Sequence, residues 1–368
     1  MKTIRVFSSE EIRDAVLDAA DYSILYMTEG AGVGLKAVVQ GPDYSEPFYV
    51  ENITNETETL TISVYDYDET GLDINIPVEY STDRINWNPL GTTALGNRLT
   101  KTLEPGDKIY LRATTDAWSK PNPHSDYMTY GNNIYGVSKV GGNIMSLLYG
   151  NNFTGNERSF PNNSASIFYM LFCDFSSYEN INLIDASKLI LPATTLADGC
   201  YSNMFYGCNL LTAVPELPAT TLSPSCYYNM FCLCSSLTQA PELPATTLAD
   251  RCYEGMFSDC VSLTQAPELP ATTLAESCYS NMFNRCTLLT HAPELPATTL
   301  AESCYYSMFI FCPNLNYIKC LATDISASSC LHDWTNFVSS TGTFIKAAGV
   351  AYPTGTSGIP SGWTVEEI

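Results

Sequence analysis

The sequence has few basic residues. Its 368 residues include 17 Lys and Arg against 39 Asp and Glu, so the formal net charge is −22 at pH 7. A charge of this sign repels phosphate backbones and anionic lipid head groups. We therefore expect no nucleic acid among the partners of this chain.

Long apolar runs are also missing. Asp, Glu, Asn or Pro interrupts every apolar stretch before it reaches the roughly 20 residues that a membrane-spanning helix needs. The amino terminus carries charged side chains where a secretory signal peptide would have its apolar region. These side chains are Glu10, Glu11, Arg13, Asp14 and Asp18. We expect neither membrane insertion nor export by a signal peptide.

Histidine is scarce, and familiar catalytic motifs are absent. The three histidines, His124, His291 and His332, lie in unrelated segments, and the sequence contains no GxSxG, HExxH or P-loop motif. We therefore expect no enzymatic activity, no cofactor and no metal site. A glycan-active enzyme is a disfavoured alternative, because it would need a carboxylate pair in a cleft, whereas a regular repeat arranges carboxylates in columns.

What the sequence does have is a 26-residue repeat. Copies of LPATTLADGCYSNMFYGCNLLTAVPE begin at Leu191, Leu217, Leu243, Leu269 and Leu295. This period lies within the range of 20 to 29 residues typical of leucine-rich repeats. Both ends of the array are degenerate, which is typical of the caps of a solenoid. One unit cannot bury its own apolar face, so we expect the stability of this half to come from stacking.

Within each unit, apolar residues recur at intervals of four. In the first unit Cys200, Met204 and Cys208 form such a series. This spacing indicates one face of an amphipathic helix, predicted over about 198–208. A short parallel strand is predicted after it, over 211–217 and its equivalents. The last copy lacks proline there, and its sequence YIKC, residues 317–320, is typical of an ordinary strand.

Ten of the fourteen cysteines occupy two positions of the repeat. Within a unit they are eight residues apart, about 12 Å along a helix, whereas a disulfide needs Cα atoms within about 7 Å. Pairing between units would leave one cysteine in each column unpaired. We interpret the cysteines as small buried hydrophobes. The predicted repeat core is Cys200, Met204, Phe205, Cys208, Cys226, Met230, Phe231, Cys234, Cys252, Met256, Phe257, Cys260, Cys278, Met282, Phe283, Cys286, Cys304, Met308, Phe309 and Cys312.

One column of the repeat is acidic. Glu216, Glu242, Glu268 and Glu294 stand 26 residues apart, and like charges stacked in register repel one another. This glutamate column could bind a cation or a basic partner, or it could form a solvated rim that keeps the repeat soluble. We favour the solvated rim.

The repeat resembles a known family. The alternation of CYxxMFxxC with LTxAPELPATTLA, over about 191–324, is similar to the BspA-like leucine-rich repeat family. The tail segments LATDISASSC, GTFIKAAG and GIPSGWTVEEI are similar to the closing part of such proteins encoded by Bacteroides and by phages that infect them. The resemblance implies an α/β leucine-rich-repeat solenoid and a loose association with adhesion, rather than a reaction.

The first half of the chain has the pattern of β-strands. FYVENI, TLTISVY, INIPVEYS and KIYLRAT alternate between apolar and polar residues and are separated by turn signals. They predict an all-β sandwich of immunoglobulin type with Trp87 and Tyr110 in its core. The predicted organisation is multidomain: an attachment or oligomerisation region with a short helix near residues 10–20 (1–40), the sandwich (41–118), a connector or collar (119–165), the solenoid (166–325) and a carboxy-terminal cap (326–368).

These features favour a phage virion structural protein, such as a head fibre, decoration or tail protein. It would be made in the host bacterial cytoplasm and located in the virion. Its amino-terminal region would bind other virion proteins, and its solenoid would bind a host cell-surface protein or glycan. Fibres are commonly homotrimeric, so we expect a homo-oligomer, with a trimer as one candidate. The alternative is a bacterial cell-surface BspA-like adhesin, which would need an export signal.

Overall fold

The computed structural model describes residues 22–29, 32–39, 42–66, 76–93, 97–113, 130–161, 165–173 and 182–368. At its start, strands β1 (Tyr22–Glu29) and β2 (Gly32–Val39) pair antiparallel. The helix expected near residues 10–20 lies outside the described residues.

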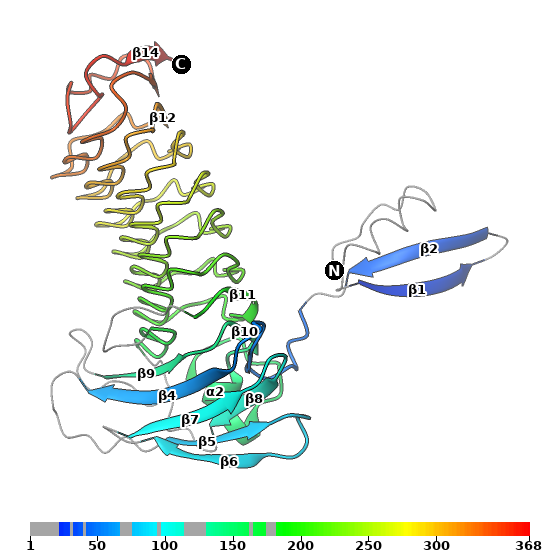
Figure 1. Cartoon of the computed structure of the whole chain (residues 1–368). Coiled ribbons are helices and arrows are strands. Elements are labelled where there is room, and N and C mark those ends of the chain that lie inside the picture. The colour runs from blue at the N-terminus through cyan, green and yellow to red at the C-terminus, as the bar shows by residue number, and fades with distance from the viewer. Residues whose placement is uncertain are drawn as a thin grey trace.

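Two sheets form the first folded part of the chain (Figure 1). The larger sheet has six strands in the order β11-β10-β3-β8-β5-β6, and the smaller has three in the order β7-β4-β9. Their inward side chains belong to one apolar core. The strands of the larger sheet are β3 (Tyr49–Glu51), β5 (Ile76–Ser81), β6 (Asn88–Thr93), β8 (Lys108–Ala113), β10 (Lys139–Asn143) and β11 (Asp185–Ile190). Those of the smaller sheet are β4 (Glu58–Asp66), β7 (Arg98–Leu103) and β9 (Tyr130–Tyr135).

The immunoglobulin-type sandwich is a wrong prediction, because β10 and β11 pair in parallel, whereas the sheets of an immunoglobulin fold are antiparallel. The larger sheet also includes strands that follow residue 118. Tyr110 is not a core residue. It lies on the outer face of β8, since the alternate residues Ile109 and Leu111 are the buried ones. Trp87 is only half-buried, with the Arg112 guanidinium 4.0 Å from its ring centroid.

The repeats stack in a column that rises from the sheets, with the carboxyl terminus at its far end (Figure 1). We call each 26-residue unit a coil, and the stack formed by residues 182–368 the column. The α/β solenoid is a wrong prediction. Among the described residues the helices are α2 (Ser146–Tyr149) and the short 3-10 helix η2 (Gly150–Asn152), and neither lies in a coil.

The segment expected to be helical, 198–208, is instead a series of turns. Its φ angle is positive at every fourth residue, with 58° at Gly199, 54° at Asn203 and 71° at Gly207. The same positions are left-handed in the following coils. An α-helix cannot continue through left-handed residues, because each one reverses the local handedness of the backbone. We call this segment and its equivalents the turn ribbons.

Backbone hydrogen bonds in a turn ribbon alternate between two directions. The N–H groups of Cys200 and Ser202 donate to carbonyls three residues earlier, at 3.3 and 3.0 Å. The intervening N–H groups of Tyr201 and Asn203 donate to Cys226 and Tyr228 of the next coil, at 3.0 and 2.7 Å. The bonds between coils fasten each coil to its neighbour, and the left-handed residue at every fourth position explains the interval of four in the sequence.

The opposite side of each coil is extended but forms few strands. Only isolated bridges such as Gln239↔Gln265 and Thr247↔Thr273 join neighbouring coils there, since the two prolines of each APELPA segment lack amide donors. The predicted strand without proline is confirmed as β12 (Tyr317–Cys320). It starts a parallel sheet with β13 (Thr343–Lys346) and β14 (Thr364–Glu367) that closes the column.

Candidate functional site

The interior of the column is a continuous apolar core. All twenty residues of the predicted repeat core are fully buried. The Phe rings of successive coils stack with centroids 5.3 to 5.8 Å apart, and the Tyr rings beside them stack at 5.7 to 6.1 Å. Both stacks end on Trp334, which lies 6.1 Å from Tyr305 and 6.3 Å from Phe309.

The Phe stack also reaches into the sheets. Phe205 of the first coil stacks on Phe172 at 5.1 Å, and Phe172 stacks on Phe48 at 6.1 Å. Phe48 precedes β3 and is buried in the core between the sheets. The sheets and the column therefore share one core.

The cysteines of the repeat are free thiols, and all are buried. Those at the second repeat position also make hydrogen bonds, because each thiol donates to the carbonyl of a Phe in the preceding coil. The Sγ to O distances are 3.2 Å for Cys234 to Phe205 and 3.1 Å for Cys260 to Phe231. Burial raises the pKa of these thiols well above the usual range. They stay protonated and serve as hydrogen-bonding core residues, not as nucleophiles.

The glutamate column lies on the extended side of the coils. Glu216, Glu242, Glu268 and Glu294 are all exposed. Glu294 Oε2 lies 3.0 Å from Lys319 Nζ in β12, so the last carboxylate of the glutamate column is paired with a lysine. Across the described residues, no group of three or more His, Cys, Asp and Glu side chains is placed to hold a metal ion. The glutamate column is thus a row of single exposed carboxylates.

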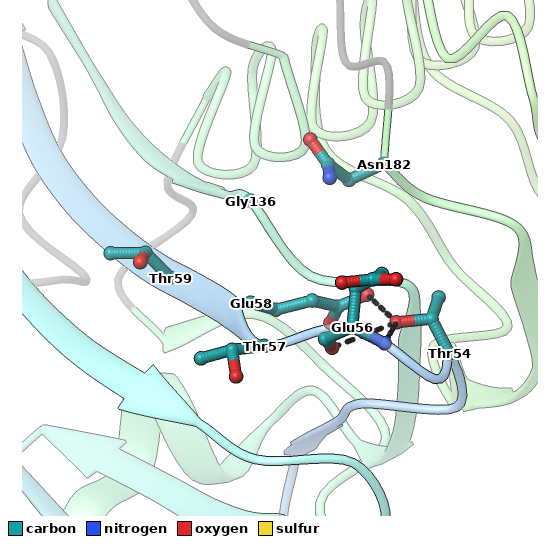
Figure 2. Close-up of a pocket in the computed structure, with 7 residues that line it drawn as sticks. All are labelled: Thr54, Glu56, Thr57, Glu58, Thr59, Gly136 and Asn182. Carbon is teal, nitrogen blue, oxygen red and sulfur yellow. Dashed lines mark hydrogen bonds between the residues drawn. The ribbon is translucent and has the colours of Figure 1, made fainter.

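A depression of about 400 Å³ lies where the sheets meet the column (Figure 2). Glu58 is its one buried carboxylate. Its Oε2 accepts from the Ser138 N–H at 3.0 Å. The Thr54 hydroxyl lies 3.3 Å from Oε1, but Asn52 Oδ1 is a closer acceptor for it at 2.8 Å. This carboxylate joins the loop around Thr54 to the start of the segment that leads into β10. The residues that line the depression are Thr54, Glu56, Thr57, Glu58, Thr59, Gly136 and Asn182.

A second cavity of about 400 Å³ lies beside the β5–β6 turn and contains two arginines. Arg112 donates from Nε and Nη2 to Glu79 Oε2, at 2.9 and 2.7 Å, so its charge is already paired. Arg84 lies 4.0 Å from Asp43, and both side chains are about half-exposed. The cavity therefore lacks a strong positive field.

A row of positions at one corner of the turn ribbons was not predicted from the sequence. It occupies the third left-handed position of each coil, and we call it the corner column. Its members are Gly207, Leu233, Asp259, Arg285, Phe311 and Phe337. Because the residue type changes from coil to coil, no consensus marks this column. Reading the sequence at intervals of 26 from Gly207 would have revealed the two phenylalanines at its end.

Comparisons with protein-family models, with curated proteins and with solved structures find no match to this chain. Among the described residues, no helix has both the length and the apolar character needed to cross a membrane.

Proposed function

We propose that this chain is a structural display protein of a phage virion, of the head-fibre, decoration or tail class. The observation that carries the proposal is the ring stack that continues from Phe48 in the sheets to Trp334 near the far end of the column. A rod whose core is continuous with its base keeps its far end at a fixed distance from whatever holds the base. The resemblance of the repeat and tail to BspA-like proteins of Bacteroides and their phages supports the same proposal.

The bonding between coils supports a rigid rod rather than a flexible tether. In each turn ribbon, alternate N–H groups bind carbonyls of the next coil, as the bonds from Tyr201, Asn203 and Phe205 show at 3.0, 2.7 and 2.9 Å. Backbone bonds in register resist bending because several must lengthen together. In this proposal the amino-terminal region binds other virion proteins, and the column binds a host cell-surface protein or glycan. The assembled form is a homo-oligomer.

Mass spectrometry and immunogold labelling of purified virions test the location. We expect the protein in the particles, with antibodies against the column labelling their surface. A bacterial surface adhesin is the competing class. Detection in the outer membrane of an uninfected bacterium, with none in virions, would reject the virion assignment.

Binding of the fluorescently labelled full chain to intact host cells tests the display function. We expect saturable binding to cells of a susceptible strain, reduced on cells stripped of surface polysaccharide or protein. A chain found in virions that binds no host cells would have a purely structural role.

A further inference from the structure

The corner column ends in two exposed phenylalanines that stack on each other. The rings of Phe311 and Phe337 lie 4.7 Å apart with an interplanar angle of 5°. Phe311 is 39% exposed and Phe337 is 62% exposed. Among the residues whose burial the structure describes, they are the only exposed phenylalanine, tyrosine or tryptophan side chains. The two rings therefore form an aromatic site on the surface of the last two coils.

The stack continues in one direction and is open in the other. Behind Phe311, the Arg285 guanidinium lies 5.3 Å from the ring centroid, and Arg285 pairs with Asp259 at 3.6 Å. The row thus runs from a carboxylate through a guanidinium to two rings. One face of Phe337 is covered by Phe311, so its exposure comes from the opposite face and the ring edge. That face is where the next planar group of the row would lie.

The ribbon that carries Phe337 also carries polar residues. Asn336 precedes Phe337 in the chain, and Asp333 lies one turn earlier in the same ribbon, with its carboxylate 3.6 Å from His332 Nε2. His332 stacks on Tyr306 of the preceding coil at 4.9 Å. An exposed apolar ring on a ribbon that also carries amide, carboxylate and imidazole groups suits a ligand with one apolar face and a polar rim.

We propose that the free face of Phe337 is a stacking subsite for a neutral sugar ring. A pyranose presents axial C–H groups on one face and hydroxyls at its edge, which matches a phenyl face with polar neighbours. This inference rests on the proposed display function, and it specifies the ligand class and the place of contact. The coil that carries Phe337, which begins after Cys320 of β12, lies near the far end of the column and away from the sheets (Figure 1).

The charge distribution explains why the sugar is neutral. The cation that touches the ring stack, Arg285, already has an acidic partner in Asp259. The chain as a whole carries a net charge of −22. Uronic and sialic acids would find no unpaired Lys or Arg beside the ring among the described residues, and they would meet repulsion from the surrounding carboxylates.

The test uses the full chain on an array of neutral, uronate-containing and sialylated oligosaccharides, with saturation-transfer NMR on the neutral sugars that bind. Phe337→Asn removes the ring, and asparagine tolerates the left-handed backbone of this position, where φ is 60°. We expect binding to neutral sugars, about tenfold weaker in Phe337→Asn and at least retained in Phe337→Trp. The matched control is Leu210→Asn in the first coil, another exposed apolar side chain, at 45% exposure.

Several results would overturn the subsite. These are an absence of sugar binding by the wild-type chain, a preference for acidic sugars, and equal weakening in Leu210→Asn. Dissociation of an oligomer by Phe337→Asn, measured by light scattering, would show that a second copy covers the ring instead. If Phe337→Asn still binds host cells as wild type does, the subsite is wrong and the display function stands. If the wild-type chain binds no cells, the display function itself fails.

Discussion

At the scale of single residues, the two cysteine positions of a coil differ in what their thiols do. Cys260 donates to the Phe231 carbonyl at 3.1 Å, whereas Cys278, at the first position, makes no such bond. Both side chains are fully buried. The two thiols therefore fill the same volume in the core, and they differ in that only Cys260 donates to a Phe carbonyl.

The pair gives a matched test of the thiol hydrogen bond. Cys260→Ala should lower the free energy of unfolding by more than Cys278→Ala, with a difference of about 1 kcal/mol, because both variants create a similar small cavity but only the first loses a hydrogen bond. Urea denaturation followed by circular dichroism measures both variants. Equal losses would mean that the thiol bond is energetically neutral.

The buried thiols also predict a dependence on pH. Burial raises the pKa of Cys312 to about 12, and it raises the pKa of Cys234, Cys260 and Cys286 well above the usual range. A thiol in the unfolded chain loses its proton near pH 8.5. Above that pH the unfolded state binds fewer protons than the folded state, so stability falls as pH rises.

We therefore expect the thermal midpoint to stay level through neutral pH and to fall as the pH rises from about 8.5 toward about 12. Differential scanning calorimetry in matched buffers measures it. Cysteine-specific alkylation at pH 8 should modify the described thiols only after unfolding. Rapid alkylation of the native chain would show that the thiols are accessible, contrary to their burial.

At the scale of the structural element, the turn ribbon shows how far the sequence could be read. The repeat, its period and its buried residues were recognisable, because the apolar positions are invariant from coil to coil. The helix was a wrong prediction because an interval of four resembles one helical turn of 3.6 residues. A helical face drifts after two or three turns, whereas Cys200, Met204 and Cys208 keep strict register.

A second signal was present at the left-handed positions. The first coil has Gly199, Asn203 and Gly207 there, and glycine and asparagine are the residues that adopt positive φ most readily. Later coils place Arg251, Leu233 and Phe311 at equivalent positions, which hides the pattern. Neighbouring coils supply the hydrogen bonds that hold these residues left-handed, and such long-range support is not visible in local sequence.

Substitution at Asn281, where φ is 54°, distinguishes a turn ribbon from a helix. Asn281→Gly should change the free energy of unfolding by less than about 1 kcal/mol, and Asn281→Val should cost about 2 kcal/mol, because a β-branched residue is strained at positive φ. In an α-helix the order would reverse, since glycine is the poorer helix former. Urea denaturation gives the order directly, and valine tolerated better than glycine would contradict the ribbon.

At the scale of the whole molecule, the junction between sheets and column rests on few rings. Phe172 stacks on Phe48 on one side and on Phe205 on the other, and it is fully buried. The parallel pairing of β10 with β11 is a second link, because Asp185–Ile190 leads directly into the first coil. Neither link was predicted from the sequence, because both join segments that are far apart along the chain.

Phe172→Ala tests whether this junction makes the chain one mechanical unit. The lost ring should cost about 3 to 5 kcal/mol, and it removes the contact through which the sheets and the column stabilise each other. We expect the single cooperative transition of the wild-type chain to split into two, because the sheets and the column would then melt separately. Differential scanning calorimetry detects the split.

The control is Phe257→Ala, which removes an equally buried ring from the middle of the column. It should lower the stability by a similar amount without separating the sheets from the column, so the calorimetric trace should keep a single transition at a lower temperature. Small-angle scattering adds a structural readout. In Phe172→Ala the column should move relative to the sheets, so the distribution of interatomic distances from scattering should become broader. In Phe257→Ala that distribution should stay as in the wild type. If both variants scatter alike, the ring stack does not hold the column upright, and the rigid display that the proposed function requires must come from the β10–β11 pair.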